Sequence, residues 1–119
     1  MMFKKPSTQP VALEPGQLTP QTPAEFVARG WLYYGRGDNG QAAADYREAL
    51  KQNENDPETL YALGMALAAS SNPQDAVQVF EQALQHLDSI EDAVRVRMLT
   101  RLIKGHINRI KTGDWHLTK

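Results

Sequence analysis

Apolar residues recur every three to four positions from about residue 22 to about residue 111, and no stretch alternates strictly between apolar and polar residues. The first pattern is typical of amphipathic α-helices, whereas half-buried strands have a period of two. Turns rich in glycine, asparagine, serine and proline interrupt the pattern at residues 35–40 and 70–73. The sequence therefore predicts an all-α chain without a sheet.

Five helices are expected, and each follows residues that favour a helix N-terminus. They run from residue 23 into the turn at 35–40, from 39 to about 52, from 57 to the break at 70–73, from 73 onward, and from 89 to about 111. Thr22 and Glu25 have the spacing of a capping box, and Pro23 suits the first turn. The other expected starts are Asp38, Asp56, Asn72 and, for the fifth helix, Ser89 with Asp92.

The two ends of the chain lie outside these helices. Residues 1–21 contain four prolines among serine, threonine and glutamine, which prevents a helix and predicts a disordered tail. The alternative is an extended segment that docks in a groove of its own domain or of a neighbour. Residues 113–119 are expected to be a C-terminal tail, in which Trp115 has no assigned role. The helical domain should therefore span residues 22–112.

Residues 23–56 and 57–90 are related by an offset of 34 residues. Six positions are identical under this offset, namely Pro23/Pro57, Ala28/Ala62, Gly30/Gly64, Ala42/Ala76, Ala49/Ala83 and Leu50/Leu84. Most of these residues are small, so they allow two antiparallel helices to approach closely while a large residue of the partner helix fills the gap. Glycine inside a helix otherwise costs about 1 kcal/mol relative to alanine. We therefore expect Gly30 and Gly64 at close helix contacts.

The period and the order of small and large residues resemble the tetratricopeptide repeat. The matching positions are Phe26, Gly30, Tyr33, Ala42, Tyr46 and Ala49, then Leu60, Gly64, Leu67, Ala76, Phe80 and Ala83. The resemblance implies a right-handed superhelix of antiparallel helix pairs, with residues 89–111 as a capping helix. The sequence departs from the family at Arg29, where leucine is usual, and at Glu54 and Asp88, where the closing proline is usual. The first pair is therefore expected to pack slightly loosely.

Proteins of the tetratricopeptide repeat family generally act as scaffolds and not as catalysts. They bind peptides or helices on the concave face formed by the first helix of each pair. The resemblance therefore implies a partner groove without a catalytic site. The residues that map to this groove are Val27, Trp31, Tyr34, Tyr61, Met65, Arg95, Leu99 and Leu102. The alternative for Trp31 and Tyr34 is burial under neighbouring helices.

An acidic C-terminal tail, which many members of the family bind, does not suit this groove. Such a ligand needs lysine, asparagine and arginine at defined positions. The corresponding residues are Val27, Trp31, Met65, Asp92 and Val96. Because none of them supplies a positive charge, we expect an apolar peptide or helix as the ligand.

The fifth helix has an apolar stripe and a basic face. The stripe consists of Val96, Leu99, Ile103, Ile107 and Ile110, and the basic face carries Arg97, Arg101, Lys104 and Lys111. Two interpretations of the stripe stay open: it packs on the second helix pair, or it forms a homodimer or recruits another helix. The basic face suggests an anion- or nucleic-acid-binding adaptor only weakly, because no aromatic residue for base stacking lies among its charges.

Charge is segregated along the chain, although the formal net charge is only −1. Residues 21–90 contain ten acidic and four basic residues, whereas residues 91–111 contain two acidic and six basic residues. The repeats therefore carry −6 and the fifth helix region +4. This boundary coincides with the end of the second repeat, which marks the fifth helix as a separate surface.

Signals of catalysis, of a cofactor and of membrane insertion are lacking in the sequence. There is no cysteine, the three histidines do not have metal-ligand spacing, and no phosphate-binding loop is present. No secretory signal is apparent, and the longest apolar run, residues 61–69, is far below the roughly 20 residues that span a bilayer. We therefore expect a soluble, cytoplasmic, non-enzymatic protein-interaction module without metal or cofactor. The alternative function is self-assembly through the fifth helix.

Overall fold

The computed structural model describes residues 14–113. It contains α1 (Pro23–Gly35), α2 (Asn39–Gln52), α3 (Pro57–Ala69), α4 (Pro73–Gln85) and α5 (Ala93–Thr112). Two short 3₁₀ turns, η1 (Pro15–Gln17) and η2 (Leu87–Ser89), precede α1 and α5. These residues include no strand, so the prediction of an all-α fold is confirmed.

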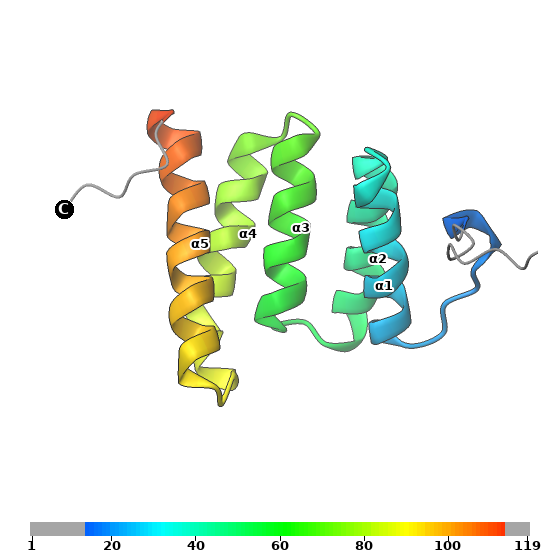
Figure 1. Cartoon of the computed structure of the whole chain (residues 1–119), viewed down its shortest axis with the longest axis horizontal. Coiled ribbons are helices and arrows are strands. Elements are labelled where there is room, and N and C mark those ends of the chain that lie inside the picture. Colours follow the sequence, from blue (N-terminus) through cyan, green and yellow to red (C-terminus); the bar gives the residue numbers. More distant parts are fainter. Residues whose placement is uncertain (1–13, 114–119) are drawn as a thin grey trace, which may run out of the picture.

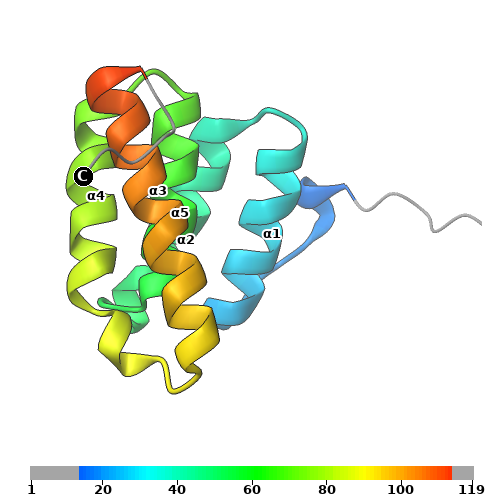
Figure 2. The same cartoon turned by 60° about the vertical axis from the view of Figure 1, so that its left-hand side comes forward.

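The helices stack in chain order, so that each helix lies beside the one before it (Figure 1). α1 packs against α2 and α3 against α4, which gives two helix pairs, and α2 joins the pairs by packing against α3. α5 packs on α4 at the end of the stack, and the turned view shows it in front of the second pair (Figure 2). The core is continuous through the stack, with Tyr46, Phe80 and Ile103 fully buried.

The helix starts follow the capping residues, although two caps act through their backbone alone. The Glu25 backbone N–H donates to Thr22 Oγ1 at 3.2 Å while the Thr22 N–H donates to Glu25 Oε1 at 3.1 Å, which completes the predicted capping box. Asp38 and Asn72 occupy N-cap positions but make no capping bond with their side chains. Their ψ angles are 66° and 61°, outside the extended region from which a cap side chain reaches back to the first turn.

The fifth helix begins at Ala93 and not at residue 89 as predicted. The carboxylate of Asp92 accepts hydrogen bonds from the N–H groups of Val94 and Arg95, so Asp92 alone is the cap. Ser89 instead ends the turn η2, and its hydroxyl donates to the carbonyl of His86. Ile90 is extended, which separates this turn from α5.

Gly30 and Gly64 each face an aromatic ring of the partner helix. A Cβ atom added to Gly64 would lie 2.5 Å from Cε1 of Phe80, and one added to Gly30 would lie 2.8 Å from Cδ1 of Tyr46. The optimal separation of two carbon atoms is about 3.5–4.0 Å, so neither position has room for a side chain. Both rings are fully buried, which leaves them no space to move away. The close contacts expected from the sequence are therefore present in both pairs.

Arg29 connects α1 with α2 and with the segment that precedes α1. Its Nε and Nη2 donate to the two carboxylate oxygens of Asp45 at 2.8 Å, and its Nη1 donates to the carbonyl of Leu18 at 3.0 Å. The hydrogen bonds to Asp45 raise the pKa of Arg29. Asp45 is buried, and a bidentate pair of this kind is geometrically specific. At Arg29, where leucine is usual in the family, polar contacts therefore join the two helices of the first pair; looser packing of this pair stays a prediction.

Residues 14–21 differ from the disordered tail that the sequence predicts for residues 1–21; residues 1–13 lie outside the described part of the chain. Pro15 is buried in η1, and Glu14 accepts a hydrogen bond from Arg36 at 2.9 Å. Together with the bond from Arg29 to Leu18, these contacts hold the segment against α1. The prolines exclude an α-helix here, but the donors that dock the segment come from arginines of the helical domain.

We predict that Gly64→Ala destabilises the chain by about 1–2 kcal/mol, because overpacking against Phe80 outweighs the higher helix propensity of alanine. The matched control is Gly40→Ala in the first turn of α2, where an added Cβ meets nothing within 4 Å. Thermal unfolding followed by circular dichroism should show a lower Tm for Gly64→Ala and no decrease for Gly40→Ala. Equal Tm values for the two variants would contradict the close contact.

Candidate functional site

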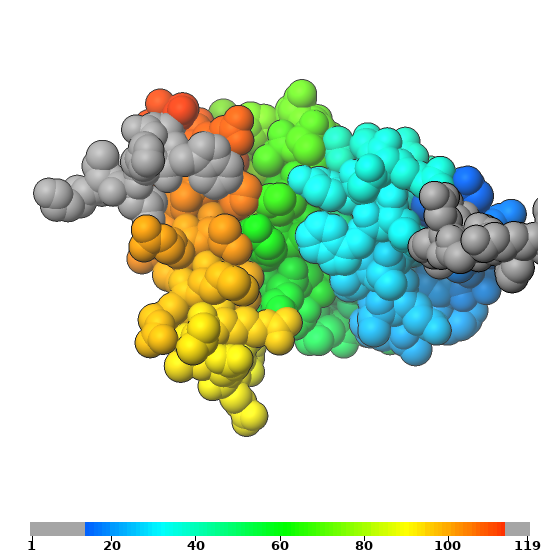
Figure 3. All heavy atoms as spheres, in the orientation of Figure 1, coloured from blue at the N-terminus to red at the C-terminus, as the bar shows by residue number. Residues whose placement is uncertain are grey.

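α1, α3 and α5 line a concave groove on one side of the stack, with a volume of about 640 Å³. In the space-filling view it is a hollow with α1 and α5 on either side and α3 at its base (Figure 3). We call this hollow the concave groove; its apolar lining consists of Pro23, Ala24, Val27, Trp31, Ala49, Tyr61, Met98, Leu99 and Leu102. The ends of α2 and α3 add polar residues, namely Asn53, Asp56, Glu58 and Thr59.

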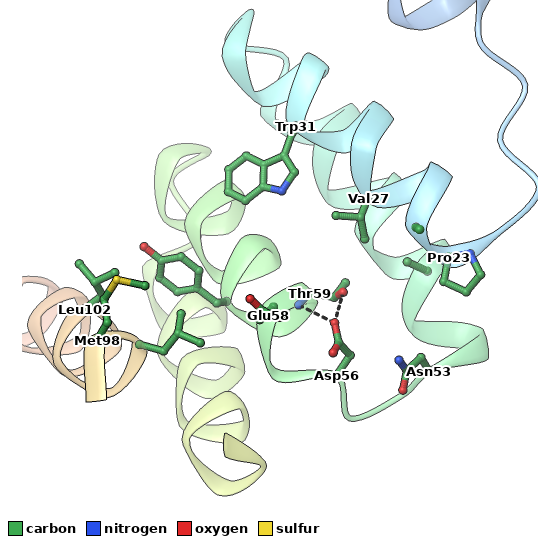
Figure 4. Close-up of a pocket in the computed structure, with 13 residues that line it drawn as sticks. Pro23, Val27, Trp31, Asn53, Asp56, Glu58, Thr59, Met98 and Leu102 are labelled. Atoms are coloured by element: carbon green, nitrogen blue, oxygen red, sulfur yellow. Dashed lines mark hydrogen bonds between the residues drawn. The ribbon is translucent and has the colours of Figure 1, made fainter. Parts of the chain in front are cut away.

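The structure brings five of the eight predicted groove residues into the concave groove. Val27 and Trp31 come from α1, Tyr61 from α3, and Leu99 and Leu102 from α5. Figure 4 shows Trp31 and Val27 on one wall, with Leu102 and Met98 on the opposite wall. The groove is therefore built from helices that are distant in sequence, as the repeat arrangement implies.

Tyr34 and Met65 line an adjacent hollow of about 560 Å³, together with Ala68, His106 and Ile110 among others. The remaining predicted residue, Arg95, forms an ion pair with Glu58 of α3. This ion pair links α5 to α3 at the end of the concave groove that carries its polar residues. Arg95 thus holds one wall of the groove to its base.

Polar groups at that end of the groove are already engaged. Asp56 Oδ2 accepts hydrogen bonds from the backbone N–H of Thr59 at 3.0 Å and from its hydroxyl at 2.5 Å (Figure 4). The carboxylate of Glu58 is paired with Arg95. Asp56 thus has hydrogen-bond partners, Glu58 has a cationic partner, and the remaining lining of the groove is mainly apolar.

Trp31 is the largest side chain that the groove exposes. Its ring lies edge-on to Tyr34 at 5.6 Å and to Tyr46 at 5.8 Å between centroids, yet 41% of the residue remains exposed. Below it, the hydroxyl of Tyr46 is buried and has no hydrogen-bond partner among residues 14–113, and burial raises the pKa of Tyr46. Trp31 is thus held in place from beneath while its outer face stays accessible, whereas Tyr34 is half-buried.

His106 of α5 packs into the aromatic layer next to the groove. Its ring stacks on Phe80 at 5.3 Å and 14°, and it lies 5.9 Å from the ring of Tyr61. Burial lowers the pKa of His106, and the positive charge of Arg109 lowers it further. The neutral imidazole is therefore favoured in the folded chain.

The apolar stripe of α5 is used inside the chain. Leu99 and Ile103 belong to the buried core, and Val96, Ile107 and Ile110 pack against it. In the structure, the stripe therefore packs on the second helix pair. Val96, Ile107 and Ile110 are only half-buried, and a contact of this stripe with a second copy or another helix stays a prediction.

The basic face of α5 points away from the core. Arg97, Arg101 and Lys104 are exposed, and Lys111 lies 3.8 Å from the carboxylate of Glu81. Val94 and Met98 are exposed beside the first three, and the sequence patterns used for the groove missed both of them. The sequence does contain a signal for them: Val94, Met98 and Leu102 follow one another at intervals of four residues, which places them on one side of a helix.

A family model of the tetratricopeptide repeat matches residues 27–89. This match covers more than half of the 119 residues and includes most of both helix pairs, so the chain belongs to the tetratricopeptide repeat family. Comparisons with curated proteins and with solved structures found no match. Repeats of this family generally mediate protein–protein interactions and generally form non-catalytic scaffolds. α5 lies beyond the matched residues.

Within residues 14–113, no helix is both long enough and apolar enough to cross a membrane. In the same range, no three side chains of histidine, aspartate or glutamate are grouped so that they could hold a metal ion. Of the three histidines, His116 lies outside the described residues.

We predict that the chain loses stability as the pH falls below about 6.5, the ordinary pKa of histidine. Because the pKa of His106 is lower in the folded state, the unfolded state binds the extra proton first. The stabilisation is complete above the unfolded pKa and is lost as the pH falls toward the folded pKa. A decrease in Tm of a few degrees between pH 7.5 and 5.5 is expected.

Substitution of His106 tests this assignment. A His106→Gln variant should have a smaller decrease in Tm over the same pH range, whereas a His86→Gln variant retains His106 and should retain the decrease that it causes. If wild type and His106→Gln lose the same number of degrees, a different group is responsible.

Proposed function

We propose that the chain is a non-catalytic interaction module that binds an apolar peptide or helix of a partner protein in the concave groove. The observation that carries this proposal is a pair of large apolar residues on opposite walls, Trp31 and Leu102, which are 41% and 40% exposed. Large apolar residues gathered in a concave surface are typical of binding sites. Membership of a family whose repeats generally bind proteins supports the same conclusion.

The construction of the groove supports an apolar ligand. Its walls are three helices that are fixed by the buried core, so little ordering is needed when a ligand binds. The carboxylate of Glu58 is paired with Arg95, and that of Asp56 accepts two hydrogen bonds from Thr59, so the ligand need not supply polar partners to either. Trp31 is a typical binding hot spot, because a wide aromatic ring buries much area with few rotatable bonds.

Phage-displayed peptides selected on the immobilised full chain provide a defined probe. We expect the selected peptides to be rich in apolar residues and to change the fluorescence of Trp31, measured in a Trp115→Phe variant that leaves Trp31 as the single tryptophan. Trp31→Ala should weaken their binding by about 2 kcal/mol, roughly thirtyfold.

Two controls keep this test specific. Leu102→Asp alters the opposite wall without removing the contacts of Trp31 with Tyr34 and Tyr46, and it should also weaken binding. Gln78→Ala changes an exposed residue of α4 outside the groove lining and should leave binding unchanged. Circular dichroism establishes that each variant is folded. Selected peptides that bind both groove variants as tightly as wild type would refute the proposal.

A further inference from the structure

α5 exposes a face whose equivalents in the two helix pairs are covered by a partner helix. The 34-residue offset places Val94, Met98 and Arg101 at the positions of Leu60, Gly64 and Leu67. The three residues of α3 are buried, and Gly64 touches the ring of α4. Val94 and Met98, in contrast, are 65% and 53% exposed, and Arg101 is exposed as well.

α5 occupies the place of the first helix of a third pair. It packs on α4 as α3 packs on α2, and it stands at the end of the row in Figure 1. Within residues 14–113, no helix covers its outer side. The two complete pairs define where the second helix of such a pair would lie.

This outer side, which we call the end face, combines apolar and basic residues. It forms a shallow hollow lined by Val94, Arg97, Met98, Arg101 and Lys104, together with Thr100. In the described part of the chain, no ion pair involves Arg97, Arg101 or Lys104. A partner that buries Val94 and Met98 must therefore bring negative charge to the three cations.

Met98 determines which residue of a partner helix fits opposite it. In the complete pairs, glycine on the first helix receives Tyr46 or Phe80 from the second helix. Methionine at the equivalent position fills that space with a flexible side chain of its own. A helix that packs here needs alanine, glycine or serine at the contact, because an aromatic residue would collide with Met98.

We propose that the end face binds an acidic amphipathic α-helix of a partner protein, with a small residue against Met98 and carboxylates against Arg97, Arg101 and Lys104. Met98 borders both this surface and the proposed peptide site, but Val94 and the three cations lie outside the lining of the concave groove, so variants at those positions test the end face alone. We propose a helical ligand because, in the two complete pairs, the second helix of the pair covers the equivalent surface.

A second copy of α5 is a poor occupant of the end face. All six charged residues of α5 are basic: Arg95, Arg97, Arg101, Lys104, Arg109 and Lys111. Packing two such helices against each other would bring like charges together, which costs free energy and disfavours the pair. Charge complementarity therefore favours an acidic helix over a second α5.

Two synthetic helices test the proposal. Both are alanine-rich peptides of about 20 residues, long enough to be helical, with the same stripe of leucine and alanine. One carries glutamate and the other lysine at the polar positions. Fluorescence anisotropy with the full 119-residue chain should show binding of the glutamate peptide, at least about tenfold weaker binding of the lysine peptide, and loss of affinity with added salt.

Variants locate the bound peptide. Val94→Asp and Arg101→Glu should each weaken binding of the glutamate peptide by about tenfold or more, since each adds a negative charge to the end face. Arg47→Glu makes the same charge change as Arg101→Glu at an exposed site of α2, and it should preserve binding. Trp31→Ala should also preserve binding of the glutamate peptide, so the proposal for the end face is tested independently of the proposal for the groove.

Four results would overturn the proposal. They are equal binding of the glutamate and lysine peptides, no binding of the glutamate peptide, loss of binding in Trp31→Ala but not in Val94→Asp, and equal loss in Arg47→Glu and Arg101→Glu. Sedimentation of the chain alone adds a fifth test. A dimer that Val94→Asp converts to a monomer would assign the end face to a second copy instead.

Discussion

The contact between one glycine and one aromatic ring in each helix pair is the constraint on which the rest of the structure depends. The rings of Tyr46 and Phe80 pass so close to Gly30 and Gly64 that the spacing of each pair is fixed by these atoms. Because both rings are fully buried, the same contacts anchor the core. Trp31 rests against Tyr46 and His106 stacks on Phe80, so each ring also supports a residue on the concave side.

The end face differs from the two helix pairs at the position of this contact. In each pair, the glycine of the first helix lies against an aromatic ring of the second helix. In α5 the equivalent residue is Met98, which is exposed, and no helix of the described chain covers it. α5 nevertheless forms a wall of the concave groove, as α1 does.

Much of this arrangement could be predicted from the sequence, because it depends on local signals that repeat. The helix pairs follow from the 34-residue offset, and five groove residues follow from the face that each first helix shares. The start of α5 and the course of residues 14–21 could not be predicted in the same way. Both Asp92 and Ser89 are suitable N-cap residues, and the sequence alone does not decide between them. The docking of residues 14–21 depends on hydrogen bonds from Arg29 and Arg36, which are distant in sequence. The rotation of α5, which buries Ile103 and exposes Met98, is decided by tertiary packing on α4.

Arg29 has a mechanical consequence. Its guanidinium holds the carbonyl of Leu18 and the carboxylate of Asp45 at the same time, so the segment before α1 is fastened to both helices of the first pair. Tension applied ahead of Glu14 would be shared between α1 and α2 and would not simply peel α1 from the stack. Because a guanidinium stays charged at all physiological pH values, Arg29 keeps its positive charge at this junction throughout that range.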